Sequence, residues 1–157
     1  MPSAVETRLE ELGLELPPPL PPPRSKMRRT AQTGDLVYMS GNGPFRGTEL
    51  VYPGKVGADL TLEEGQEAAK LTALNMTRVL RDEGYDLDRI RWVKALGMVN
   101  SDPSFTDQHQ VVNGFSETIL AIFGEENGLP ARSACGMASM PWNMAVEIEA
   151  ICELLDA

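Results

Sequence analysis

Hydrophobic and polar residues alternate along this chain with two periods, one typical of helices and one typical of strands. Apolar residues recur at helical spacing from Leu62 to Leu80, which predicts a helix over residues 61–81 that packs on a sheet. Thr61 and Glu64 form a capping-box pattern at the start of this helix.

Two further helices follow from similar patterns. An apolar stripe between Val112 and Phe123 predicts a helix over residues 104–123, which Gly124 should end. Residues 3–13 predict a short helix at the amino terminus.

Strands are predicted between these helices. The pattern indicates a hairpin of two short strands with a turn at Gly34-Asp35, a brief third strand, and a long central strand that is apolar on both faces. The expected ranges are 28–32, 36–40, 50–52 and 89–100.

The segment from Leu129 to Leu155 predicts two more strands, joined by a tight turn at residues 141–144. In the second strand the even-numbered residues are apolar and should face the helices, whereas Glu147 and Glu149 lie on the other face. A sheet with helices on one side only leaves that other face open, which favours association of subunits.

The element order is β-β-(β)-α-β-α-β-β, which predicts an α+β fold with a mixed sheet packed on two helices. Before this domain, assigned to residues 27–157, residues 1–26 combine the short helix with the proline-rich run at 16–23. That run must be extended. We interpret it as a rigid arm on the domain surface, with a docking motif for a partner as the alternative.

The composition of the chain excludes some classes of function. The 157-residue chain carries a net charge of −9, and its one local basic cluster is Arg24, Lys26, Arg28 and Arg29, so we expect no nucleic-acid partner. We found no signal peptide and no apolar run long enough to span a membrane, which predicts a cytoplasmic protein without a membrane partner.

Candidate metal ligands are too few for a metal site. His109 is the only histidine, and the two cysteines, Cys135 and Cys152, form no Cys-x-x-Cys pattern. We interpret both cysteines as reduced, with a disulfide between them as the alternative.

Arg132 is the first candidate for chemistry, because its neighbours are small or apolar and a guanidinium is a fork for a carboxylate. If residues 141–144 form a hairpin turn, Glu147 lies opposite Ala138, and Arg132 lies six residues further along, or roughly 20 Å away. Arg132 and Glu147 therefore need a second subunit to share one site. The alternative is that Arg132 forms a capping or interface salt bridge and that Glu147 is a carboxylate at the edge of an interface.

Four other residues carry weaker signals. Asn113 lies within a predicted helix, where asparagine is unfavourable, so it is a candidate for binding a loop or a ligand. The rings of Trp92 and Trp142 are interpreted as fillers of the core or of an interface. His109 is expected on the surface.

Four segments together resemble the RidA family, also called the YjgF family and associated with the name endoribonuclease L-PSP. They are GDLVYMSG at 34–41, ALN at 73–75, QVVNGF at 110–115 and PARSACGMASMPWNMAVEIEAI at 130–151. Details of the sequence within and between these segments indicate a divergent subgroup of the family. The resemblance implies a chorismate-mutase-like fold, assembled as a homotrimer with clefts between subunits.

The resemblance also implies an activity. Well-known members hydrolyse enamines and imines such as 2-aminoacrylate to 2-keto acids and ammonia, without a metal or organic cofactor. Arg132 matches the arginine that binds the substrate carboxylate, and Glu147 matches the glutamate that orients a water molecule. Ser40 and Gly41 match the loop that lines the cleft, and Asn113 matches a helix asparagine.

Two positions depart from the family pattern. Met27 stands where the active deaminases have a tyrosine, and Ala134 stands where many members have a cysteine. Three functions are therefore carried forward: an imine and enamine deaminase, a non-catalytic protein that binds a small anion such as a keto acid, and an endoribonuclease. The net charge of −9 argues against the third.

Overall fold

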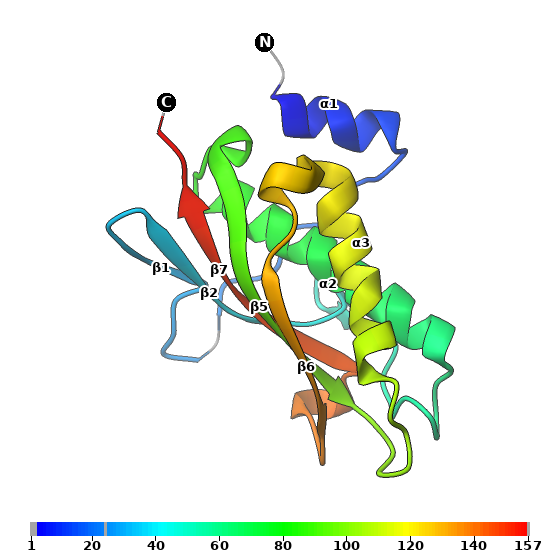
Figure 1. The fold of residues 1–157 in the computed structure, drawn as a ribbon. Coiled ribbons are helices and arrows are strands. Elements are labelled where there is room, and N and C mark those ends of the chain that lie inside the picture. The colour runs from blue at the N-terminus through cyan, green and yellow to red at the C-terminus, as the bar shows by residue number, and fades with distance from the viewer. Residues whose placement is uncertain (1–2, 24, 157) are drawn as a thin grey trace.

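A five-stranded mixed sheet with two long helices on one of its faces forms the body of the protein (Figure 1). The structure is a computed structural model that describes residues 3–23 and 25–156. Arg24 of the predicted basic cluster lies outside the described residues. The arrangement confirms the predicted α+β class and the chorismate-mutase-like fold.

The strands of the sheet follow the order β1-β2-β7-β5-β6, so β1 and β6 form its edges. The elements of the sheet and of the helical layer are α1 (Ala4–Glu11), β1 (Thr30–Thr33), β2 (Leu36–Asn42), α2 (Leu62–Asp82), β5 (Ile90–Asn100), α3 (Gln108–Asn127), β6 (Ala131–Met137) and β7 (Val146–Leu154). Smaller elements are β3 (Phe45–Arg46), β4 (Glu49–Leu50) and the 3₁₀ turns η1 (Leu87–Arg89) and η2 (Pro141–Asn143).

Local chemistry explains where the long helices begin and end. The predicted capping box of Thr61 and Glu64 is present at the start of α2. The prediction for α3 was early by four residues, because the Asp102 carboxylate accepts hydrogen bonds from the backbone N–H and hydroxyl of Ser104 and holds a turn there. Gly124, with a φ of 77° and a ψ of 173°, breaks the helical backbone as predicted, and a short helical segment beyond this kink carries α3 on to Asn127.

The predicted hairpin between the last two strands is wrong. β5 lies between β6 and β7, parallel to the first and antiparallel to the second. The segment β5-α3-β6 is therefore a βαβ unit, in which the helix connects two parallel neighbours. The eight residues between β6 and β7 cross the end of β5 instead of forming a tight turn. The brief strand predicted at 50–52 is present as β4, but it begins one residue earlier, and Val51 and Tyr52 lie outside it.

The faces of β7 follow the predicted alternation. Val146, Ile148 and Cys152 are fully buried against the helices, whereas Glu147 and Glu149 lie on the other face of the sheet, here called the open face. Cys135 is exposed and Cys152 is buried, and both are free thiols, as predicted. Trp92 fills the core, where Phe115 and Phe123 contact its ring edge to face.

The segment before β1 packs on this domain. The N–H groups of Ala4 and Val5 at the start of α1 donate to the Asp88 carboxylate, at 2.8 and 2.9 Å. Leu16 and Leu20 of the proline-rich run pack against the core, in agreement with the interpretation as a surface arm. No described helix has an apolar stretch of the length that a bilayer requires.

Candidate functional site

Arg132 projects from the edge strand β6 toward α3, which fixes its guanidinium group. Its Nη1 donates to Asn113 Oδ1 and to Ser116 Oγ, both at 2.9 Å, and its Nη2 donates to the backbone carbonyl of His109 at 3.2 Å. His109 itself is exposed, as predicted. The structure therefore brings Arg132 and Asn113 together.

Three of the five N–H donors of Arg132 are used in this way. The Nε–H and one Nη2–H have no acceptor among the described residues. A guanidinium with two donors left over and its position fixed by a helix is suited to bind a carboxylate. No acidic side chain pairs with Arg132 within the described part of the chain.

Glu147 forms a second group with Gly41, on the open face of the sheet. A side-chain carbon added at Gly41 would lie only 2.0 Å from Oε1 of Glu147, so the carboxylate rests directly on the glycine backbone. A bulge in the pairing of β2 with β7 falls between Met39 and Asn42, around Ser40 and Gly41. The glycine is thus required by the space that Glu147 occupies.

The environment of Glu147 favours its protonated form. Partial burial raises the pKa of its carboxyl group above the usual value, and repulsion from Glu149 raises that pKa further. A carboxyl group with a raised pKa is suited to exchange protons with a bound water molecule. Ser40 borders this group, where its hydroxyl donates to the carbonyl of Arg28 at 2.7 Å.

The predicted site residues therefore form two separate groups on opposite faces of the sheet. Arg132 pairs with Ala95 of β5, and Glu147 pairs with Met98, so their Cα atoms are two strands and three residues apart, or roughly 14 Å. The predicted separation of the two residues within one chain holds, although its reason is the intervening strand β5 and not the length of a hairpin.

Ser116 is a residue of the Arg132 group that the sequence did not single out. It lies three residues after Asn113, so helical spacing alone places both side chains on one face of α3. That spacing is the signal by which it could have been found. Trp142 is 77% exposed, so the interpretation of its ring as a filler of the core is wrong, whereas its alternative as a filler of an interface stays a prediction.

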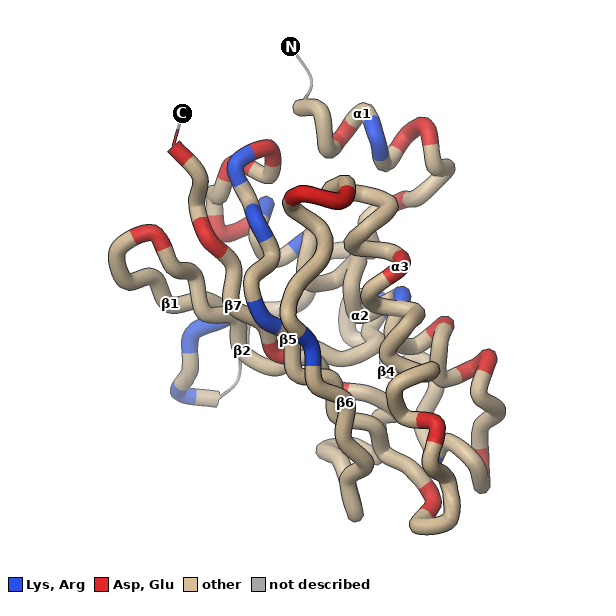
Figure 2. Tube along the Cα trace, in the orientation of Figure 1, with Lys and Arg blue, Asp and Glu red and all other residues tan. Residues whose placement is uncertain are grey.

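Charge is distributed unevenly over the fold. Figure 2 shows basic positions along β5, the strand that pairs with the Arg132 strand β6, in a trace whose helices and loops carry many acidic positions. Among the described residues no group of three His, Cys, Asp or Glu side chains is arranged to hold a metal ion.

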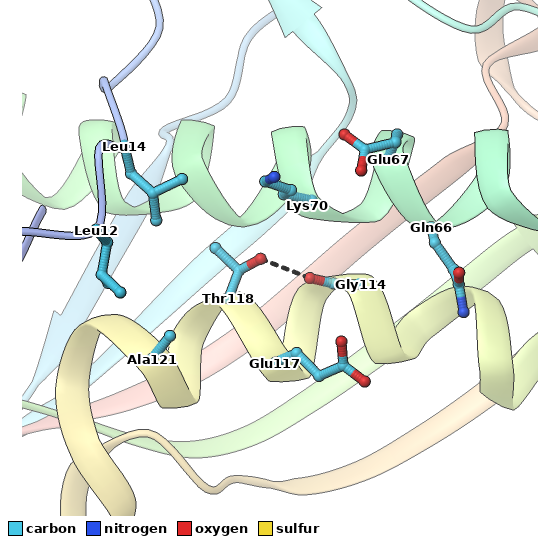
Figure 3. A pocket seen from close by; sticks show the side chains of 9 residues that line it. All are labelled: Leu12, Leu14, Gln66, Glu67, Lys70, Gly114, Glu117, Thr118 and Ala121. Carbon is cyan, nitrogen blue, oxygen red and sulfur yellow. Dashed lines mark hydrogen bonds between the residues drawn. The ribbon is translucent and has the colours of Figure 1, made fainter.

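A groove with a volume of about 340 Å³ lies on the outer side of the helical layer, between α2 and α3 (Figure 3). Leu12 and Leu14 line one end of it, and Lys70 lies further along. Gly114 and Thr118 line its α3 side, where the Thr118 hydroxyl donates to the Gly114 carbonyl at 2.7 Å. This groove contains neither Arg132 nor Glu147.

Comparison with known proteins identifies a family and proteins of similar sequence and fold. Residues 6–154 match the family model described as "YjgF/chorismate_mutase-like, putative endoribonuclease". Protein TCP17 of Trypanosoma cruzi is 40% identical over 151 residues, which cover 96% of this chain and 94% of that protein.

Two solved structures are also similar. Atu1372 from Agrobacterium tumefaciens, a protein described as having unknown function, shares 39% identity and a TM-score of 0.86 over 96% of this chain and 92% of that one. A "putative endoribonuclease" from Shewanella oneidensis shares 30% identity and a TM-score of 0.90 over 96% and 99%. From the family model, these relatives and the shared fold, we conclude that the chain belongs to the RidA (YjgF) family.

Proposed function

We propose that this protein hydrolyses small imines or enamines that carry a carboxylate, releasing a 2-keto acid and ammonia. The reaction takes place in clefts of a homotrimer, each built from Arg132 and Asn113 of one subunit and Glu147, Ser40 and Gly41 of the next. The fixed guanidinium of Arg132, with its two unused donors, is the observation that carries the proposal.

Each group has one role in this reaction. Arg132 binds the substrate carboxylate and sets the position of the carbon–nitrogen double bond. An enamine is first protonated on carbon to give the iminium form. Glu147 accepts a proton from water as the water oxygen bonds to the iminium carbon, and it returns that proton to nitrogen. As the C–N bond breaks and ammonia leaves, the hydroxyl oxygen forms the C=O bond of the keto acid and its proton passes to the Glu147 carboxylate.

A coupled assay tests the activity directly. A pyridoxal-phosphate enzyme generates 2-aminoacrylate or 2-iminobutyrate, and the release of the 2-keto acid is followed with and without this protein. We expect acceleration that is lost in Arg132→Ala. No acceleration over buffer, or an Arg132→Ala variant as active as the parent, contradicts the proposal.

Binding of a keto acid or similar small anion without turnover is the second candidate. It is favoured by the two departures from the family pattern: Met27, which is 48% exposed, stands in place of the family tyrosine, and Ala134, packed against the core, in place of the cysteine. Tight binding of 2-oxobutyrate by calorimetry, together with no acceleration in the coupled assay, would identify this function.

Two further statements belong to the proposal. We place the protein in the cytoplasm, which the two free cysteines support. Endoribonuclease activity is the third hypothesis, and the net charge of −9 argues against it because RNA backbones repel such a protein. Incubation with RNA should therefore leave the RNA intact.

A further inference from the structure

The proline-rich run at 16–23 is a feature of the chain that the proposed function does not use. Proline fixes its own φ at about −65° and pushes the residue before it toward an extended conformation. The run is therefore a left-handed polyproline II helix with three residues per turn. Residues three apart lie on the same side of such a helix, so the run has three sides.

The burial of the run follows this period of three. On the first side Pro17 is buried, and Leu14 and Leu20 are half-buried against the core. One side of the polyproline helix therefore packs on the domain and the other two face outward. The exposed residues are Pro18 and Pro21 on the second side and Pro19 and Pro22 on the third.

Hydrogen bonds to two carbonyl groups hold the run in place. Arg78 Nη1 of α2 donates to the Pro17 carbonyl at 3.4 Å, and Arg29 Nη2 donates to the Pro21 carbonyl. Within residues 3–23 and 25–156, no donor reaches the other proline carbonyls of the run. Because proline has no N–H group, the run cannot join a sheet, but these carbonyls are able to accept hydrogen bonds from a partner.

Positive charge follows the run directly. Lys26 and Arg28 are both exposed, and Figure 2 shows basic positions in the segment that leads from the run to β1. The chain as a whole has a net charge of −9. A partner with carboxylates at one end of its binding groove is therefore attracted to this segment and repelled by most of the remaining surface.

We propose that the run is a docking site for a protein domain whose groove is lined by aromatic side chains and has carboxylates at one end. Such a groove covers two sides of a three-sided helix, so the side that packs on this domain is the one that the partner does not need. The packing also fixes the extended conformation before the partner arrives, which lowers the entropic cost of binding. This inference does not depend on the proposed hydrolysis.

Calorimetry with the full-length protein and a panel of purified SH3 domains, whose grooves are lined by aromatic side chains, tests the docking site. We expect at least one domain to bind and free poly-L-proline to compete with this binding. Each of two double variants removes one exposed side of the run: Pro18→Ala/Pro21→Ala and Pro19→Ala/Pro22→Ala. Each should weaken the binding at least about tenfold, because two apolar contacts are lost.

Three controls accompany these variants. Pro103→Ala changes an exposed proline outside the run and should bind like wild type. Lys26→Glu/Arg28→Glu should weaken the binding at low salt and remove most of its salt dependence, because the attraction to the carboxylates is lost. Thermal unfolding should show that both proline double variants are as well folded as wild type, since the changed side chains are exposed.

Several results would overturn the docking site. One is that no domain of the panel binds the wild-type protein. Another is that either proline double variant binds as tightly as wild type. A smaller oligomer of a double variant in light scattering would place the run in an interface between copies of this chain instead. An unchanged affinity in Lys26→Glu/Arg28→Glu would overturn the carboxylates assigned to the groove of the partner.

Discussion

Arg132 and Glu147 lie on opposite faces of one β-sheet, with β5 between the strands that carry them. The guanidinium is bonded to α3 on the helical side, and the carboxylate rests on Gly41 on the open face. A single chain therefore cannot bring its own Arg132 and Glu147 into one site. In the proposed homotrimer, each head-to-tail interface would bring the Arg132 surface of one copy to the Glu147 surface of the next.

Mixed oligomers test this arrangement. Arg132→Ala and Glu147→Gln should each be inactive alone. When the two variants are unfolded together, refolded and assayed for 2-keto acid release, about one quarter of the clefts should regain both residues by random assembly. Activity near a quarter of the wild-type value is the expected result.

Refolding each variant alone under the same conditions provides the control. If the mixture is no more active than the separate variants, although light scattering shows mixed trimers, the two residues do not work in one shared cleft. If light scattering shows that the wild-type protein is a monomer, that result alone contradicts the arrangement.

Arg132→Lys should weaken keto-acid binding although it keeps the positive charge. An ammonium group cannot donate to Asn113, Ser116 and the His109 carbonyl while also presenting two parallel donors to a carboxylate. We expect a loss of about 10- to 100-fold in affinity for 2-oxobutyrate by calorimetry. Arg78→Lys, on the surface of α2, is the matched control and should bind normally.

The activity should fall at acidic pH with a midpoint above the usual pKa of a glutamate. Glu147 must be ionised to accept a proton, and burial followed by repulsion from Glu149 raises its pKa. Glu149→Gln removes the smaller of these two causes. In Glu149→Gln, the midpoint of the acid limb of the kcat/KM profile should therefore move to lower pH. It should stay above the usual pKa of a glutamate, because the larger cause, burial, remains.

The same shift affects stability with a definite sign. A carboxyl whose pKa is higher in the folded state binds more protons when folded, so its contribution to stability falls as pH rises from the unfolded to the folded pKa. Denaturant unfolding of wild type and Glu147→Gln should show the variant gaining relative stability as pH rises through this range. A constant difference would mean that the pKa of Glu147 is not shifted.

Two glycine substitutions should have contrasting effects. Gly41→Ala places a methyl group against the flexible Glu147 carboxylate, which can rotate away, so we expect a folded protein with a displaced carboxylate and little activity. Gly114→Ala places the methyl group 2.1 Å from the backbone carbonyl of Gln66, so α2 and α3 must separate, at a cost of about 1–3 kcal/mol. Thermal unfolding and the keto-acid assay distinguish the two: a strongly destabilised Gly41→Ala would contradict this account.

Periodicity predicted most elements because each depends on its own residues. The capping box of Thr61 and Glu64 sets the start of α2, and the alternation along β7 correctly placed Glu147 on the open face. The start of α3 was missed because a side-chain hydrogen bond from Ser104 to Asp102 competes with helical pairing, and no hydrophobic pattern records that competition.

Strand neighbours were harder to predict, since pairing depends on contacts between distant segments. β6 and β7 follow each other in the chain, and adjacency in sequence suggested a hairpin. The helix between β5 and β6 carried the better signal, because a helical crossover favours parallel pairing of the strands that it joins. The position of Trp142 had no sequence signal, because the turn that carries it is held by Asn100, whose side chain donates to Asn143 and accepts from Lys55.

The position of β7 also bears on how the chain is made. β2 and β5 bond to β7 and not to each other, so the last strand to leave the ribosome is the one that joins the two halves of the sheet. Until then both halves present unpaired strand edges, which are sites for aggregation. Folding of the sheet must therefore wait until synthesis reaches β7, and chaperones that shield nascent chains should matter most during that interval.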